Sequence, residues 1–162
     1  MKALTVTQPW VTLIAVGAKH VETRSWTTGH RGLLAIHAAH RFPTWARELC
    51  QTDPFRLVLD QAGITGPEAL PCGMVLATCR LAAVRPTSRP LPATWPVGRH
   101  EVAFGDYRFG RYAWLLTDVT PLTRPVLARG ALGLWSWVPG PPLPTLRLED
   151  LVDDSGTPER AG

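Results

Sequence analysis

The chain has few residues of the kinds that build disulfide or metal-linked frameworks. Among 162 residues it has three cysteines, Cys50, Cys72 and Cys79, and no two of them form a CxxC pair. An odd number of cysteines without paired spacing supports neither a disulfide framework nor a zinc site. The five histidines are scattered, and no two have the i, i+4 spacing of a helical metal site. We therefore expect no bound metal.

Long apolar runs are also missing. Hydrophobic residues make up 45% of the chain and charged residues 19%, and no segment has the roughly 20 consecutive apolar residues that a membrane-spanning helix needs. This composition is typical of a soluble globular domain, and no membrane partner is expected. No apolar stretch of signal-peptide length precedes Gln8 and Pro9, so we expect a cytoplasmic location.

Common catalytic and cofactor motifs are absent. The sequence has no GxSxG nucleophile motif, no phosphate-binding GxxxxGK[ST] motif and no dinucleotide-binding GxGxxG motif. These absences argue against the common hydrolases, kinases and dehydrogenases. We expect no cofactor.

Lysine is scarce, with two residues against fifteen arginines, and charge is unevenly distributed along the chain. Residues 1–138 carry a net charge of +7, whereas residues 139–162 carry −3 and begin with four prolines within six residues. The change predicts one domain over 1–138, followed by a proline-rich linker and acidic tail over 139–162. A basic domain attracts polyanions, although arginines spread over a surface do so without binding any one ligand specifically.

Short alternating or apolar runs separated by turn residues predict an α+β domain. We expect a small, curled sheet of about five to six strands with flanking short helices. A strand over 19–26 is expected at an exposed edge, and a strand over 33–40 is expected in the sheet centre. The remaining expected strands are 3–7, 73–84, 112–122 and one ending near 138, with a short helix over 10–17 and two more within 43–71.

Three charged side chains directly after a turn at Gly17 form the first candidate site. Lys19, Glu22 and Arg24 bring an amine, a carboxylate and a guanidinium within six residues. On a strand, Glu22 and Arg24 face the same side. A buried lysine can act as a base, and arginine binds phosphate or carboxylate with paired donors. The alternative is a solvated strand edge with an ordinary ion pair.

Aromatic residues and one histidine complete the candidates. Five of the seven tryptophans could stack on a base, namely Trp10, Trp26, Trp114, Trp135 and Trp137, but most of the seven must pack in the core. Trp26 is the best candidate because Arg24 and Arg31 lie close to it in sequence. His37 ends an apolar strand, which favours a core histidine and leaves a general base or hydrogen-bond donor as the alternative.

Several motifs in this sequence resemble those of the ASCH domain family. QPWVTLIAVGAKHVETRSW followed by RGLLAIHAA resembles the family signature of Pro-Trp, Gly-x-Lys-x-x-Glu-x-Arg, Arg-Gly and Ile-His-Ala. LPCGMVLAT, FGDYRFGRYAWLLTDV and RPVLARGALGLW are similar to later blocks, so the likeness covers most of residues 3–138. The resemblance implies a PUA-like fold, a small closed β-barrel with helices beside it.

The resemblance also implies a cleft near the first helix that binds RNA or a modified nucleotide. It would bring Lys19, Glu22 and Arg24 into one pocket, with His37 as a neighbour. Together with the residues chosen above, the candidate binding set is Trp10, Lys19, Glu22, Arg24, Trp26, Arg31 and His37.

One branch of the family is similar to amidohydrolases that deacetylate N4-acetylcytidine with a lysine, a threonine and a glutamate. Lys19 matches the lysine, but Glu22 stands where that branch has its threonine. The third group would come from the segment after the long strand, where Glu101 is the only glutamate and Asp106 a weaker substitute.

Three functions follow from these observations. The first is binding of RNA, single-stranded DNA or a modified nucleoside through the charged cleft. The second is an amidohydrolase of acylated cytosine nucleosides or a ribonuclease, with Lys19 as base and Glu22 or Glu101 as acid or water-positioning group. The third is an adaptor that binds an unknown protein partner through the proline-rich tail or the long loop over 85–98.

Overall fold

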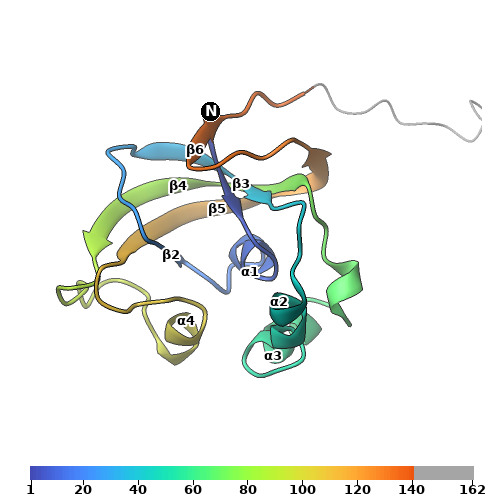
Figure 1. Cartoon of the computed structure of the whole chain (residues 1–162), viewed down its shortest axis with the longest axis horizontal. Helices are drawn as coiled ribbons and strands as arrows, with labels where there is room; N and C mark the ends of the chain where they lie inside the picture. The colour runs from blue at the N-terminus through green and yellow to red at the C-terminus, as the bar shows by residue number, and fades with distance from the viewer. Residues whose placement is uncertain (141–162) are drawn as a thin grey trace, which may run out of the picture.

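The structure, a computed structural model, describes residues 1–140 of the chain (Figure 1). Its strands are β1 (Lys2–Val6), β2 (Val21–Arg24), β3 (Gly32–Ala38), β4 (Met74–Pro86), β5 (Tyr112–Leu127) and β6 (Leu134–Ser136). Its helices are α1 (Trp10–Ala15), α2 (Thr44–Leu49), α3 (Phe55–Gln61), the 3-10 helix η1 (Pro67–Ala69) and α4 (Arg99–Ala103). The α+β class and the number of strands confirm the prediction.

The six strands form one mixed sheet in the order β2-β5-β4-β3-β1-β6. β1 pairs with β3 in parallel, and every other neighbouring pair is antiparallel. The order confirms the expected edge position of β2 and the central position of β3. β2 is nevertheless mostly buried, because side chains from the segment around α4 cover it.

Two long strands give the sheet its curl. β4 and β5 span 13 and 16 residues, and their pairing shifts register between Val75 and Ala77, between Thr78 and Arg80, and between Leu81 and Ala83. An extra residue in one strand bends it and increases its local twist. The strands therefore curve around the helices (Figure 1). Among the described residues no pairing joins β2 to β6, so the sheet is a half-barrel rather than the closed barrel that the resemblance implied.

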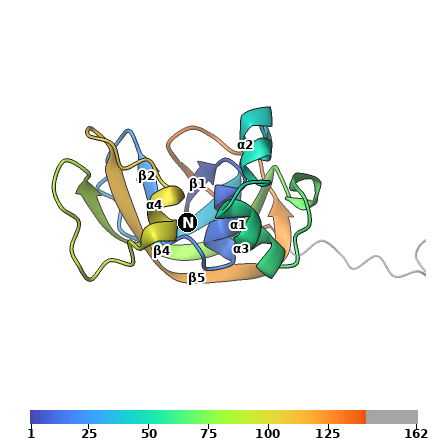
Figure 2. The ribbon, with the colours of Figure 1, turned by 90° about the horizontal axis from the view of Figure 1, so that it is seen from below.

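Helix α1 connects the two main hydrophobic clusters. Its residues Val11 and Ile14 pack in the sheet core, which includes the fully buried Trp114, whereas Leu13 joins a second cluster with Phe55 and Phe104. In Figure 2, α1, α2 and α3 lie together, and α4 lies beside β2. The second cluster thus links the α2–α3 pair to the segment after α4.

Two elements differ from the expectation. Helix α4 was not predicted, because five residues are too few for a helical period to be recognised. Strand β5 continues past the expected end at residue 122 to Leu127, and it includes Pro121 and Pro125.

Residues 141–162, most of the predicted linker and tail, lie outside the described residues, and the domain boundary at 138 stays a prediction. The longest helix within residues 1–140 is α3 with seven residues, so none of the described helices can span a membrane.

Candidate functional site

A cavity of about 660 Å³ opens between the end of β1, the start of α1, β2 and the segment after α4. Its volume falls in the range of pockets that hold small ligands. Aromatic, basic and acidic side chains meet in its lining, namely Trp10, Trp45, Glu22, Arg24, Asp106, Arg108 and Arg111. We refer to it as the β2 cavity.

Lys19 lies behind the wall of this cavity. Helix α1 ends at Ala15, and the turn that follows it contains Gly17, whose φ of 76° is in the left-handed region. The N–H groups of Ala18 and Lys19 both donate to the carbonyl of Leu13. This turn directs Lys19 into the protein directly before β2, and its side chain is fully buried. The sequence left the direction of this side chain open.

The ammonium of Lys19 is surrounded by acceptors. It donates hydrogen bonds to the carbonyl oxygens of Val21 and Phe104. It also lies 3.6 Å from Glu22 Oε2 and 3.8 Å from Glu101 Oε1. Because an unpaired charge in the interior is costly, these four acceptors are what allow the lysine to be buried.

Glu101 fastens α4 to the start of β2. Its side chain is 4% exposed, and its two oxygens accept hydrogen bonds from the backbone N–H groups of His20 (2.8 Å) and Val21 (2.9 Å). The amidohydrolase alternative needs a glutamate from this segment near Lys19, and Glu101 Oε1 lies 3.8 Å from Lys19 Nζ. Both oxygens are committed to the backbone, however, so Glu101 acts as a positioning residue in this arrangement.

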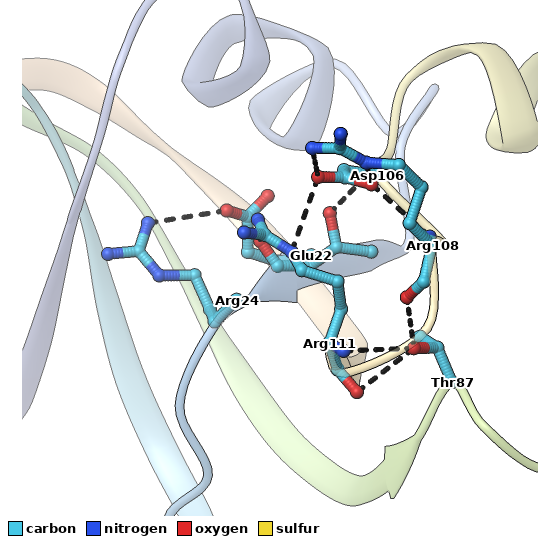
Figure 3. A network of polar contacts seen from close by, with 7 residues as sticks. Glu22, Arg24, Thr87, Asp106, Arg108 and Arg111 are labelled. Carbon is cyan, nitrogen blue, oxygen red and sulfur yellow. Dashed lines mark hydrogen bonds and ion pairs between the residues drawn. The ribbon is translucent and has the colours of Figure 1, made fainter.

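Glu22 and Arg24 share the cavity-facing side of β2, as the strand period predicted. Arg24 Nη1 lies 3.5 Å from Glu22 Oε1 (Figure 3). The Glu22 side chain is 8% exposed, and Arg24 is 25% exposed. The carboxylate therefore lies in the wall of the cavity, with the guanidinium nearer its rim.

The segment after α4 adds two arginines that Asp106 orients. Asp106 accepts hydrogen bonds of 2.8 Å from Arg108 Nε and Nη2, and its Oδ2 lies 3.4 Å from Arg111 Nε (Figure 3). The hydrogen bond from Arg108 is the main reason that the pKa of Asp106 lies well below its usual range. The N–H of Asp106 donates to Thr23 Oγ1, which ties this group to β2.

Thr87 holds the far end of the same segment. Its hydroxyl lies 2.7 Å from the carbonyl of Arg108 and 3.0 Å from that of Arg111, and it accepts a hydrogen bond from the N–H of Arg111 (Figure 3). The backbone that carries both arginines is thus held at two points.

A pair of tryptophans also lines the cavity. The rings of Trp10 and Trp45 lie 5.8 Å apart between centroids at an angle of 50°. Trp45, on α2, is 58% exposed, which is unusual for so large an apolar side chain in the absence of a partner. Trp10 was among the predicted stacking residues, and Trp45 was not.

Tyr107 packs against Gly105, which belongs to the cavity lining. A methyl group built on Gly105 would lie 2.5 Å from Tyr107 Cε2, so only glycine permits this close approach. Burial, and secondarily the charges of Glu101 and Glu22, raise the pKa of the Tyr107 hydroxyl.

Three predicted site residues lie outside the β2 cavity. Trp26 packs edge to face on Trp114, with ring centroids 4.7 Å apart, and it reaches the site only through Arg24, whose guanidinium lies 5.6 Å from its ring. Arg31 is exposed and donates to nearby loop carbonyls. The β2 cavity therefore includes Trp10, Glu22 and Arg24, with Lys19 behind its wall. Its lining does not include Trp26, Arg31 or His37.

His37 lines a different hollow. This hollow has a volume of about 810 Å³ and also involves Thr5, Gly130 and Leu132. His37 is buried, its Nε2 lies 3.0 Å from the carbonyl of Ala128, and its ring packs edge to face on Trp135. Although this hollow is larger, it lacks the convergence of charged and aromatic groups found in the β2 cavity. The core interpretation of His37 fits this position better than the site interpretation.

Three residues of the cavity lining were not predicted from the sequence, namely Trp45, Arg108 and Arg111. Arg108 and Arg111 lie in the segment FGDYRFGRY. Its two glycines and its aspartate are typical of an ordered turn, and the aspartate stands two residues before Arg108. No local signal marks Trp45, since its role depends on the packing of α2 against α1.

Replacing Lys19 by methionine tests its role in the fold. Lys19→Met keeps the apolar stem but leaves Glu22 and Glu101 buried without their countercharge. We expect the free energy of unfolding, measured by urea denaturation, to fall by about 3–5 kcal/mol. The chain's other lysine, Lys2, is exposed on β1, and we expect Lys2→Met to change stability by less than about 0.5 kcal/mol. Equal stability of the two variants would refute the proposed role.

The buried His37 should make stability depend on pH. Burial lowers the pKa of His37 below its ordinary 6.5, against the opposing hydrogen bond to Ala128. Just below pH 6.5 the unfolded chain therefore binds more protons at this residue than the folded chain does. The free energy of unfolding consequently decreases as the pH is lowered through this range. The loss of unfolding free energy between about pH 7.5 and 5.5 should be smaller in His37→Gln than in the wild type. The exposed His100→Gln is the control, and an undiminished loss in His37→Gln would contradict the assignment.

Comparison with known proteins identifies relatives of the chain. A family model for the ASCH domain matches residues 4–102. Activating signal cointegrator 1 from Homo sapiens is 37% identical over 73 residues, and the Mus musculus protein is 36% identical over the same length. The match covers 45% of this chain but only 12% of each relative's length.

Solved structures of an ASCH protein from Zymomonas mobilis are also similar. The wild-type protein is 17% identical, with a TM-score of 0.48 over 85% of this chain and 87% of that chain. A tyrosine-to-phenylalanine mutant is 15% identical, with a TM-score of 0.46 over 85% and 89%. The family model, which spans more than half of the chain and includes both Lys19 and Glu101, carries the assignment. The chain belongs to the ASCH domain family, within the PUA-like superfamily.

Proposed function

We propose that the β2 cavity binds a nucleotide of single-stranded RNA or DNA, with the base inside the cavity and the phosphates at its rim. The observation that carries this proposal is that two tryptophans and three arginines line the same cavity. Aromatic rings stack on bases of any sequence, and arginine binds phosphate through paired donors.

The tryptophans support the base-binding part of the proposal. Trp45 is exposed beside Trp10, and both line the cavity. A stacked base would cover the apolar surface that Trp45 leaves open. Stacking contributes about 1–3 kcal/mol per base.

The arginines support the phosphate-binding part. Arg24, Arg108 and Arg111 line the cavity together with Glu22 and Asp106, so cations outnumber anions there. Asp106 holds Arg108 and Arg111 in place before any ligand arrives, which lowers the entropy cost of binding. Membership of the ASCH family and the net positive charge of residues 1–138 favour the same polyanionic class of ligand.

The geometry does not favour the hydrolase alternative. A general base needs an accessible lone pair within hydrogen-bonding reach of the substrate. Lys19 is fully buried behind the cavity wall among four acceptors, and both oxygens of Glu101 accept backbone hydrogen bonds. The adaptor alternative depends largely on residues 141–162, which lie outside the described part of the chain.

Binding of a labelled single-stranded RNA, followed by fluorescence anisotropy at several salt concentrations, tests the proposal. We expect the combined variant Arg24→Ala and Arg108→Ala to lower affinity at low salt by about tenfold or more, because charge-assisted hydrogen bonds are lost. The slope of log affinity against log salt should also decrease by about 1–2.

A charge-matched control separates the cavity from the overall charge. Arg56 and Arg89 are exposed and lie outside the cavity lining, and replacing both by alanine removes the same charge. This control variant should keep most of the affinity. No binding by the wild type at low salt, or equal losses in the two double variants, would exclude the proposal.

A further inference from the structure

The Glu22 carboxylate is the one acidic group of the described cavity lining that is not already occupied by hydrogen bonds. Asp106, the other carboxylate, accepts two hydrogen bonds of 2.8 Å from Arg108. Within residues 1–140, neither oxygen of Glu22 accepts a hydrogen bond. Its two cationic neighbours form ion pairs only, with Arg24 Nη1 at 3.5 Å from Oε1 and Lys19 Nζ at 3.6 Å from Oε2.

The Glu22 carboxylate faces the cavity without a hydrogen-bond donor from residues 1–140. Each of its oxygens has two lone-pair directions, so the existing ion pairs leave room for further donors. A ligand that covers this carboxylate must itself supply donors, because a polar group buried without hydrogen bonds costs free energy. A ligand that enters the cavity can therefore gain most by presenting N–H groups to Glu22.

The number and type of donors decide which base fits. An ionised carboxylate only accepts, and its two oxygens suit two adjacent N–H donors. Guanine presents such a pair, N1–H and the N2 amino group, on one edge. Adenine and cytosine each place a ring-nitrogen acceptor beside their amino group, and uracil places a carbonyl on each side of its single N–H.

Arg24 complements the same edge. The O6 carbonyl of guanine adjoins N1–H, and the guanidinium beside Glu22 Oε1 supplies a donor for it. The tryptophans stack on any base, so they contribute affinity without choosing among bases. Selectivity within this cavity therefore depends on the Glu22–Arg24 pair.

We infer that the β2 cavity selects guanine, with the Glu22 carboxylate accepting hydrogen bonds from N1–H and the N2 amino group. This inference rests on the proposed binding of single-stranded nucleic acid. Replacing guanine by another unmodified base leaves a carboxylate oxygen facing an acceptor or lacking a donor. Loss of one bidentate pair corresponds to a discrimination of about fivefold to 150-fold.

The test uses five pentanucleotides of RNA, UUXUU, with guanine, hypoxanthine, adenine, cytosine or uracil at X. Quenching of tryptophan fluorescence measures each affinity for the wild-type chain. We expect UUGUU to bind at least about fivefold more tightly than the adenine, cytosine and uracil oligomers. The hypoxanthine oligomer should lie between them, because it keeps N1–H but lacks the N2 amino group.

A variant changes the acceptor pattern with little change of shape. Glu22→Gln presents one acceptor and one donor, so it should lose the guanine preference and bind UUAUU or UUCUU at least as tightly as UUGUU. Glu48→Gln, an equal change of charge at an exposed position on α2, should keep the preference. Circular dichroism verifies the fold of both variants. The comparison of guanine with hypoxanthine uses the wild-type chain alone, so it tests the inference even if a variant fails to fold.

The outcomes separate the inference from the function on which it rests. Comparable binding of all five oligomers would overturn guanine selection but leave nucleic-acid binding intact. Tightest binding of the adenine, cytosine or uracil oligomer, or a guanine preference that survives in Glu22→Gln, would also overturn it. Absence of binding to every oligomer at low salt would overturn both.

Discussion

The buried charge of Lys19 is the constraint on which the arrangement around the β2 cavity depends. An ammonium taken out of water needs acceptors, and here they come from β2, from α4 and from the segment that follows it. Satisfying one side chain therefore brings together segments about 80 residues apart in the chain. Glu101 strengthens the same connection by accepting the N–H groups of His20 and Val21. The short helix α4 is held in this way although its N-cap, Gly98, makes no side-chain hydrogen bond.

The cavity results from this connection and has two kinds of charged group. Asp106 and Thr87 are structural, because they fix the backbone and the guanidinium groups of Arg108 and Arg111. Glu22 and Arg24 form an ion pair at 3.5 Å, and neither side chain makes a hydrogen bond within residues 1–140. The cavity is therefore preorganised, because Asp106 and Thr87 hold Arg108 and Arg111 in a fixed geometry before a ligand binds.

Local patterns predicted much of the fold but only part of the site. Alternation and apolar runs located the strands, and the mixture of polar and β-branched residues in VETR correctly indicated an edge strand. The strand period also placed Glu22 and Arg24 on one side. The direction of Lys19 and the exposure of Trp45 could not be predicted, because each is decided by contacts with distant segments. His37 was expected near the trio, but β3 carries it to another hollow, beside Trp135.

The central claim is that the β2 cavity, and not the larger hollow beside His37, receives the nucleic acid. Titration of the 15N-labelled chain with a short single-stranded RNA tests it through the tryptophan indole N–H signals. The account predicts that the signals of Trp10 and Trp45 shift or broaden on binding. The signal of Trp135, whose indole N–H donates to Thr5 in the other hollow, should stay unchanged. A shift of Trp135 with Trp10 and Trp45 unaffected would contradict the account.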